Sequence, residues 1–176
     1  MVYSNLNICH IETSMTTTSD LEMTTKDTTA KPFECETGKL ISSEEFQCTA
    51  STKHNNNFGC EKAFDGKLGT DWATIDQGVG AWITARFRKK QLITKINFLQ
   101  RANPAEANKK VQLDFGKSGE ELASLTKKTK EWNSITLAKK YLTDNINVTV
   151  KEVYGTIHNG FKEIQIFGCE FEDPNP

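Results

Sequence analysis

The chain of 176 residues contains no apolar run near the roughly 20 residues that a membrane-spanning helix needs. It also lacks excess positive charge, since its net charge is −1, and this argues against general nucleic-acid binding. H-E-x-x-H, G-x-S-x-G and phosphate-binding glycine motifs are absent, and His10, His54 and His158 stand in linker or loop contexts. We therefore expect a protein that is not an enzyme.

The N-terminal segment has neither a basic region nor an apolar core, so no signal peptide is expected in this chain. Between Thr13 and Ala30, ten of eighteen residues are Ser or Thr, with no aromatic residue to build a core. This composition predicts a disordered linker over residues 1–34, either an O-glycosylated stalk or a plain polar spacer. One domain should then occupy residues 35–170, with a short tail at 171–176.

The rest of the chain alternates apolar and polar residues with a period of two, as β-strands do. The alternation is clear in the segments 83–88, 96–98, 111–115, 135–137, 146–150 and 164–166. Turn residues separate them at Asn103-Pro104, Gly116–Gly119, Thr143–Asn145 and His158–Gly160. These short strands predict an all-β fold, an antiparallel β-sandwich. A helical turn over residues 120–129 is the alternative for that stretch.

Five cysteines indicate an oxidising compartment, because no C-x-x-C pair suggests zinc or redox chemistry. Cys35 and Cys169 bracket the strand-rich segment, Cys48 and Cys60 lie inside it, and Cys9 stands alone. Spacing alone leaves three pairings of the four open. A sequon at Asn147-Val148-Thr149 predicts N-glycosylation of Asn147 and agrees with secretion.

The loop AFDGKLGTDW, residues 63–72, gathers oxygen donors around an Asp-Gly turn. Asp65, Thr70 and Asp71 offer carboxylate and hydroxyl groups, and backbone carbonyls can complete the oxygen shell that Ca²⁺ prefers. Far along the chain, Glu163 begins the alternating strand FKEIQIFG.

The order of these segments resembles the discoidin, or F5/8 type C, domain family of the galactose-binding-like superfamily. The resemblance rests on AFDGKLGTDWAT, GAWITARFRKKQLITKINFLQR and GFKEIQIFGC, and covers about residues 35–169. It implies a jelly roll closed by Cys35–Cys169, leaving Cys48–Cys60 to join the first long loop. It also implies a structural Ca²⁺ held by Asp65, Thr70, Glu163 and the carbonyls of Ala63 and Leu68, with Asp71 pointing outward.

In sandwiches of this kind, loops at one end carry recognition while the strands form a rigid frame. Sugars bind where an aromatic ring covers their apolar face and polar side chains reach their hydroxyl groups. The candidate ligand-binding residues are Phe58, Arg101, Asn103, Trp132 and His158. The resemblance favours Arg101 as the main ligand contact. Its alternative role is an ion pair with Glu106 or another carboxylate. If Arg101 is an exposed site residue, replacing it should leave the melting temperature almost unchanged.

These observations predict an extracellular adhesion module, secreted or at the cell surface, that binds a glycan or protein ligand as part of a larger multidomain protein. One alternative is a structural spacer domain without a ligand. Another is a module for anionic glycans or phospholipid membranes, suggested by Phe58 at a loop tip and by four lysine pairs, which otherwise form a solvated face. The pairs are Lys89-Lys90, Lys109-Lys110, Lys127-Lys128 and Lys139-Lys140.

Overall fold

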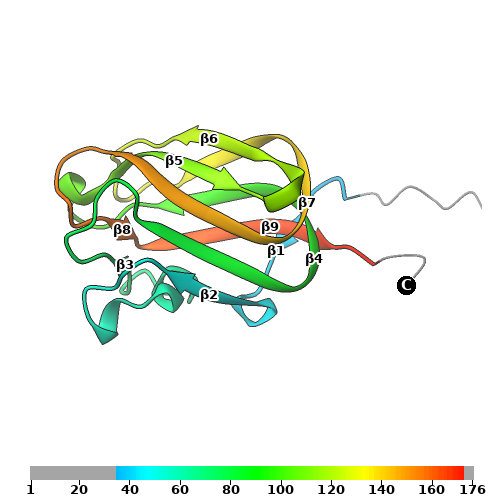
Figure 1. Ribbon diagram of the computed structural model, residues 1–176, viewed down its shortest axis with the longest axis horizontal. Coiled ribbons are helices and arrows are strands. Elements are labelled where there is room, and N and C mark those ends of the chain that lie inside the picture. Colours follow the sequence, from blue (N-terminus) through cyan, green and yellow to red (C-terminus); the bar gives the residue numbers. More distant parts are fainter. Residues whose placement is uncertain (1–34, 173–176) are drawn as a thin grey trace, which may run out of the picture. The chain divides into compact units, whose positions relative to one another are not determined.

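The computed structural model describes residues 35–172, which form an antiparallel β-sandwich (Figure 1). The predicted linker at 1–34, with Cys9 and His10, and the tail beyond residue 172 lie outside the described residues. No helix in the described part is long and apolar enough to cross a membrane. The strands are β1 (Lys39–Leu40), β2 (Phe46–Ala50), β3 (Trp72–Ala73), β4 (Trp82–Leu99), β5 (Asn108–Asp114), β6 (Glu120–Ser124), β7 (Asn133–Val153), β8 (Gly160–Phe161) and β9 (Glu163–Glu170).

Short 3-10 turns connect these strands. They are η1 (Ser43–Glu45), η2 (Asn56–Phe58), η3 (Cys60–Ala63), η4 (Pro104–Glu106) and η5 (Gly116–Ser118). The main sheet has the order β1-β9-β4-β7-β5-β6, β2 pairs with the first part of β4, and β3 pairs with β8 in a small second sheet.

Strands β4 and β7 are much longer than the segments expected from the alternation, because each continues through a bend. Their register shifts between Arg86 and Gln91, opposite Thr143–Asn145. Before the shift β4 also pairs with β2, and after it β4 also pairs with β9. The two strands therefore contribute to both layers of the sandwich, one with β2, β5 and β6 and the other with β1 and β9. The predicted turn at Thr143–Asn145 is a bend within β7.

The alternative of a helical turn over residues 120–129 is wrong, since residues 120–124 form β6 along β5 and residues 125–129 are not helical. Ala123 is buried while Leu122 is exposed, which is the period of a strand with one face on the core. Between the layers, the largest fully buried side chains include Trp72, Phe98, Phe115 and Phe161. Trp72 and Phe98 both pack on Phe161, so the small β3–β8 sheet is anchored to the main core.

Both disulfides that the resemblance implied are present. Cys35–Cys169 joins the start of the described chain to β9, and Cys48–Cys60 joins β2 to η3. The second bridge encloses the loop between β2 and η3, which contains His54 and Phe58. The second disulfide thus restrains the loop that carries Phe58.

Candidate functional site

The candidate ligand residues come from loops at one end of the sandwich, where β4 ends and β7 begins, at the left of Figure 1. Phe58 lies in the β2–η3 loop, Arg101 and Asn103 follow β4, Trp132 precedes β7, and His158 precedes β8. We call this end the loop end. The predicted ligand residues thus lie in loops at this one end of the sandwich.

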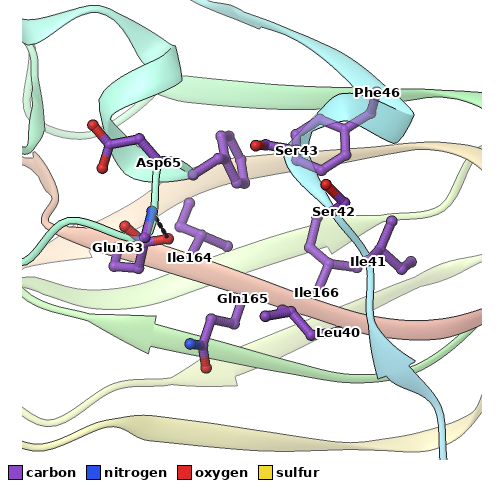
Figure 2. Close-up of a pocket in the computed structure, with 12 residues that line it drawn as sticks. Leu40, Ile41, Ser42, Ser43, Phe46, Asp65, Glu163, Ile164, Gln165 and Ile166 are labelled. Carbon is purple, nitrogen blue, oxygen red and sulfur yellow. Dashed lines mark hydrogen bonds between the residues drawn. The ribbon is translucent and has the colours of Figure 1, made fainter.

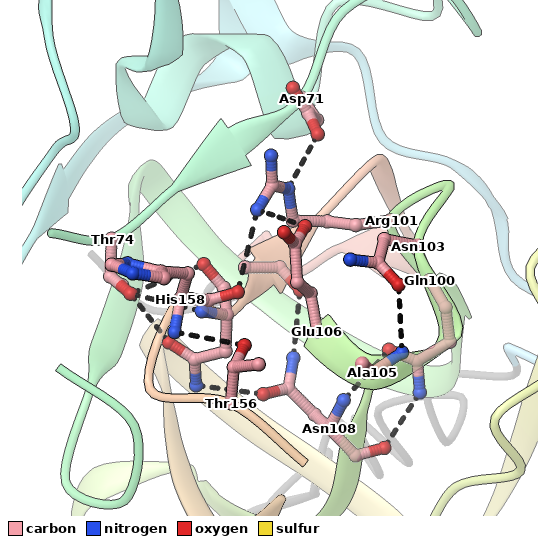
Figure 3. A network of polar contacts seen from close by, with 12 residues as sticks. Asp71, Thr74, Gln100, Arg101, Asn103, Ala105, Glu106, Asn108, Thr156 and His158 are labelled. Carbon is pink, nitrogen blue, oxygen red and sulfur yellow. Dashed lines mark hydrogen bonds and ion pairs between the residues drawn. The ribbon is translucent and has the colours of Figure 1, made fainter. Parts of the chain in front are cut away.

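Arg101 is held on two sides by carboxylates (Figure 3). Its Nε lies 2.6 Å from Asp71 Oδ2, and its Nη1 lies 2.6 Å from Glu106 Oε2. Its Nη1 also donates to the carbonyl of His158 at 3.4 Å. The Arg101 side chain is only 15% exposed, so the guanidinium is fixed in position with a limited part of its surface open to solvent.

Asp71 does not point outward as the sequence indicated. Its side chain is 18% exposed and forms one of the two 2.6 Å ion pairs of Arg101, so it belongs to the loop-end group. The pair with Glu106 was the alternative role considered for Arg101, and it is present. Sequence spacing gave no sign of the Asp71 contact, because thirty residues separate the two side chains along the chain.

One aromatic ring lies beside the guanidinium. The Phe58 ring centroid lies 5.9 Å from Arg101 Cζ, and the His54 ring in turn packs on Phe58 in a T-shaped contact with ring centroids 5.7 Å apart. His158 is half exposed, with Nδ1 at 3.6 Å from Asp76 Oδ1. The loop end therefore offers an aromatic face beside hydrogen-bond donors and acceptors.

Two of the predicted ligand residues are less closely associated with this group. Asn103 caps η4 by accepting a hydrogen bond from the Ala105 amide, so its side chain has a structural partner. Trp132 is 39% exposed, and among residues 35–172 no hydrogen bond or ring contact joins it to Arg101.

A buried polar network supports the loops from below (Figure 3). Asn159 accepts from the Thr74 hydroxyl at 2.6 Å and donates to Asn108 Oδ1 at 2.8 Å. The backbone of Asn108 forms two hydrogen bonds with the Gln100 side chain. The Asn108 N–H donates to Gln100 Oε1, and the Asn108 carbonyl accepts from Gln100 Nε2. All four side chains are buried, so their mutual satisfaction fixes the loops that carry Arg101 and His158. The sequence did not predict this network, because its members are isolated polar residues separated along the chain.

The predicted calcium ligands Asp65, Thr70 and Glu163 lie around one turn. Figure 2 shows Asp65 and Glu163. The Thr70 hydroxyl lies 2.9 Å from both carboxylate oxygens of Asp65. The Gly66 amide donates to Glu163 Oε1 at 3.2 Å, which connects the turn to β9. Ala63 is buried in η3, and Leu68 lies on the exposed part of the loop.

Glu163 is the electrostatically unusual member of this cluster. Its side chain is 4% exposed, and its Oε2 is buried without a hydrogen-bond partner among the described residues. Burial and, to a smaller extent, the nearby Asp65 carboxylate raise the pKa of Glu163 to about 7, while the Gly66 amide opposes this shift. An orphaned carboxylate oxygen beside a second carboxylate is an arrangement that a cation would neutralise.

Asn147 lies in β7 between β4 and β5, on the outward face of the sheet because Ile146 and Val148 are buried. Its side chain accepts from Thr84 Oγ1 and donates to Thr149 Oγ1. Glycosylation at this position stays a prediction.

The chain was compared with known families and structures. The family model described as a domain of unknown function (DUF7402) matches residues 37–167. No curated protein matches the sequence. Among solved structures, the family 32 carbohydrate-binding module of Clostridium perfringens NanJ in complex with galactose is 15% identical with a TM-score of 0.63, covering 73% of this chain and 97% of the module.

Two further structures are similar to the same extent. A Clostridium perfringens module, CpGH89CBM32-5, in complex with GalNAc-β-1,3-galactose is 17% identical with a TM-score of 0.63, covering 73% of this chain and 99% of that one. An F5/8 type C domain from Bacteroides fragilis is 12% identical with a TM-score of 0.63, covering 76% and 98%. At these identities the likeness establishes the fold alone, which is the β-sandwich fold of these carbohydrate-binding modules and of the F5/8 type C domain.

Proposed function

The chain belongs to the DUF7402 family, and from its loop end we propose that it is a non-catalytic module that binds an extracellular glycan. The observation that carries this proposal is the Arg101 guanidinium, fixed by Asp71 and Glu106 beside the Phe58 ring and the half-exposed His158. Carboxylates accept hydrogen bonds from sugar hydroxyls, the guanidinium donates to them, and the ring covers an apolar sugar face. The galactose and GalNAc-β-1,3-galactose complexes of modules with this fold support the same ligand class.

The extracellular setting is supported by the two disulfides, which form and persist in oxidising compartments. We also propose that this module is one domain of a larger multidomain protein. Its size supports this, because the described part forms a single small sandwich.

The test is a glycan array probed with the full chain, followed by calorimetry with the best hit. Phe58→Ala and His158→Ala should each weaken binding at least about fivefold, because each removes one contact worth about 1 kcal/mol. Leu122→Ala is the matched control, since Leu122 is an exposed residue of strand β6, outside the loops that carry Phe58, Arg101 and His158. Absence of binding on the array would favour a spacer domain, and equal affinities for all variants would contradict the loop-end site.

We also propose that a structural Ca²⁺ stabilises the module. Asp65 and Glu163 would hold it through carboxylates, Thr70 through its hydroxyl, and Ala63 and Leu68 through carbonyls. The buried, partnerless Oε2 of Glu163 supports this, because a hard cation supplies the missing interaction. Bound Ca²⁺ would neutralise the two carboxylates. It would also fix the 63–72 loop, which includes Asp71.

Chelation tests the metal separately from the glycan. The melting temperature should be several degrees higher in millimolar Ca²⁺ than in EDTA, because a ligand at a hundredfold excess over its dissociation constant stabilises the native state by about 2.7 kcal/mol. Asp65→Ala should abolish this difference, whereas Asp114→Ala, which removes a carboxylate near η5, should keep it. Identical melting curves for the wild type in both conditions would contradict the calcium site.

A further inference from the structure

The end of the sandwich away from the loop end carries a groove of about 560 Å³. Its walls are the bend of β4 at residues 86–90, the bend of β7 at residues 142–145 and the η5 turn. The three segments meet here because the register shift between Arg86 and Gln91 turns β4 beside β7. We call this feature the bend groove.

Three cationic side chains line the bend groove: Arg86, Lys90 and Lys117. All three residues are exposed, and within residues 35–172 none of them forms an ion pair. Asp144 is the one acidic residue lining the groove, and its carboxylate accepts a hydrogen bond from the Asn145 side chain rather than from a cation. The groove therefore has a surplus of positive charge in a chain whose net charge is −1.

Four of the eight paired lysines that the sequence singled out are neutralised by glutamates. Lys109 and Lys110 share Glu152, and hydrogen bonds from Lys110 and then Lys109 lower the pKa of Glu152 to about 2. Lys89 pairs with Glu170, whose hydrogen bond raises the pKa of Lys89, and Lys128 pairs with Glu131. The unpaired cations of the bend groove are instead Lys90, from one of the lysine pairs, and Arg86 and Lys117, which line the same groove.

The frame of the bend groove is rigid. Phe115 stacks on Tyr141 with ring centroids 4.0 Å apart, and the Ser118 hydroxyl donates to the Leu142 carbonyl, so η5 is fixed to β7. Gly116 and Gly119 adopt φ of 63° and 121°, which non-glycine residues rarely occupy, and they hold the turn on which Lys117 stands. A fixed frame lowers the entropy that a ligand must overcome on binding.

We propose that the bend groove is a second binding site, specific for the sulfate groups of an acidic polysaccharide. The Arg86 guanidinium suits the bidentate geometry of a sulfate oxyanion, and the two ammonium groups add point charges around it. A lipid surface is less suited to the groove, because no large exposed apolar side chain lines it for insertion into a bilayer. This site is independent of the glycan proposed at the loop end.

The experiment measures binding of a heparin oligosaccharide to the full chain over a range of salt concentrations. The variant R86Q/K90Q/K117Q should bind about tenfold more weakly, since each exposed charge contact contributes about 0.5 kcal/mol. The slope of the logarithm of the binding constant against the logarithm of the salt concentration should also become shallower, by about one unit for each lost contact. The matched control K127Q/K130Q/K151Q removes the same charge from exposed lysines that also lack an ion pair in the described part, and it should bind like the wild type.

Equal losses in both triple variants, or no binding by the wild type, would overturn the proposal, because the attraction would then be general charge or absent. Inorganic sulfate and phosphate competition shows whether the oxyanion alone is recognised, and stronger competition by phosphate would overturn the assignment to sulfate. Vesicles containing phosphatidylserine form another arm, and groove-dependent binding to them in preference to heparin would overturn the polysaccharide. Lys117→Gln, on an exposed turn, supplies the same comparison if the triple variant does not fold.

Discussion

Arg101 illustrates how a single residue changes meaning once its partners are known. The sequence treated it as an exposed ligand contact, whereas the structure shows a largely buried guanidinium between Asp71 and Glu106. A cation in this position holds two carboxylates near each other, and removing it leaves their charges without compensation. Arg101 therefore contributes to folding as well as to the proposed recognition.

We predict that Arg101→Ala lowers the free energy of unfolding by about 1–3 kcal/mol. This differs from the nearly unchanged melting temperature that an exposed residue would give. Urea unfolding measures the effect, and Lys53→Ala, an exposed cation of the neighbouring loop without an ion pair in the described part, is the control. An unchanged urea midpoint for Arg101→Ala would show that the two ion pairs do not stabilise the loop end.

Glu163 gives a prediction about pH in the absence of Ca²⁺. Its folded pKa of about 7 lies above its ordinary value of 4.5, so the native state retains a proton that the unfolded chain has released between these two pH values. The Glu163 carboxyl should therefore cost no stability below about pH 4.5 and should lower stability progressively as the pH rises to about 7, by a few kcal/mol at most.

Glu163→Gln removes this titration. In EDTA, its stability relative to the wild type should increase as the pH rises from about 4.5 to about 7 and then stay constant. Thermal unfolding of both proteins across this pH range measures the difference. A difference that does not depend on pH would mean that the Glu163 carboxylate titrates normally in the folded protein.

Among the elements, the short β3–β8 pair depends most on one residue. Gly160 has φ of 153°, and a Cβ atom there would lie 1.9 Å from the Trp72 carbonyl oxygen. Because that oxygen belongs to a strand in the core, neither side can move easily. The pair in turn positions the loop that contains His158 and the buried Asn159.

We predict that Gly160→Ala destabilises the domain by about 2–4 kcal/mol through this clash. Gly69→Ala is the control, because a Cβ at Gly69 meets no atom within 4 Å and its backbone is not in the left-handed region. Chemical denaturation compares the two variants. Similar stabilities would indicate that β3 and β8 can separate without cost to the core.

At the scale of the whole domain, the two disulfides differ in the length of chain that they close. Cys35–Cys169 spans 134 residues and Cys48–Cys60 spans 12. In the chain-entropy model these loops correspond to about 5 and about 3 kcal/mol. The long bridge therefore acts on the stability of the entire sandwich, while the short bridge restrains the β2–η3 loop.

We predict that C35S/C169S reduces the unfolding free energy more than C48S/C60S does, while C48S/C60S has the larger effect on binding at the loop end. Guanidinium unfolding and calorimetry with the bound glycan separate the two effects. Equal losses of stability would show that strain or residual structure in the unfolded state outweighs loop entropy.

The sequence by itself determined the fold class, because a period of two along several segments is the direct consequence of strands with one buried face. It also located the Asp65 turn, Glu163 and the loops of the loop end, since those signals are local or carried by a family resemblance. It did not show that β4 and β7 pass through their bends, because a bend with turn-forming residues such as Thr143–Asn145 has the composition of a true turn.

The tertiary structure alone decided which charges meet. Asp71 reaches Arg101 across thirty residues, Glu152 neutralises two lysines of a neighbouring strand, and Arg86, Lys90 and Lys117 surround one groove without a carboxylate partner in the described part. Pairing of this kind depends on strand order and register, which no local pattern records. The physical reason is that electrostatic energy depends on distances in space, whereas the sequence specifies only separations along the chain.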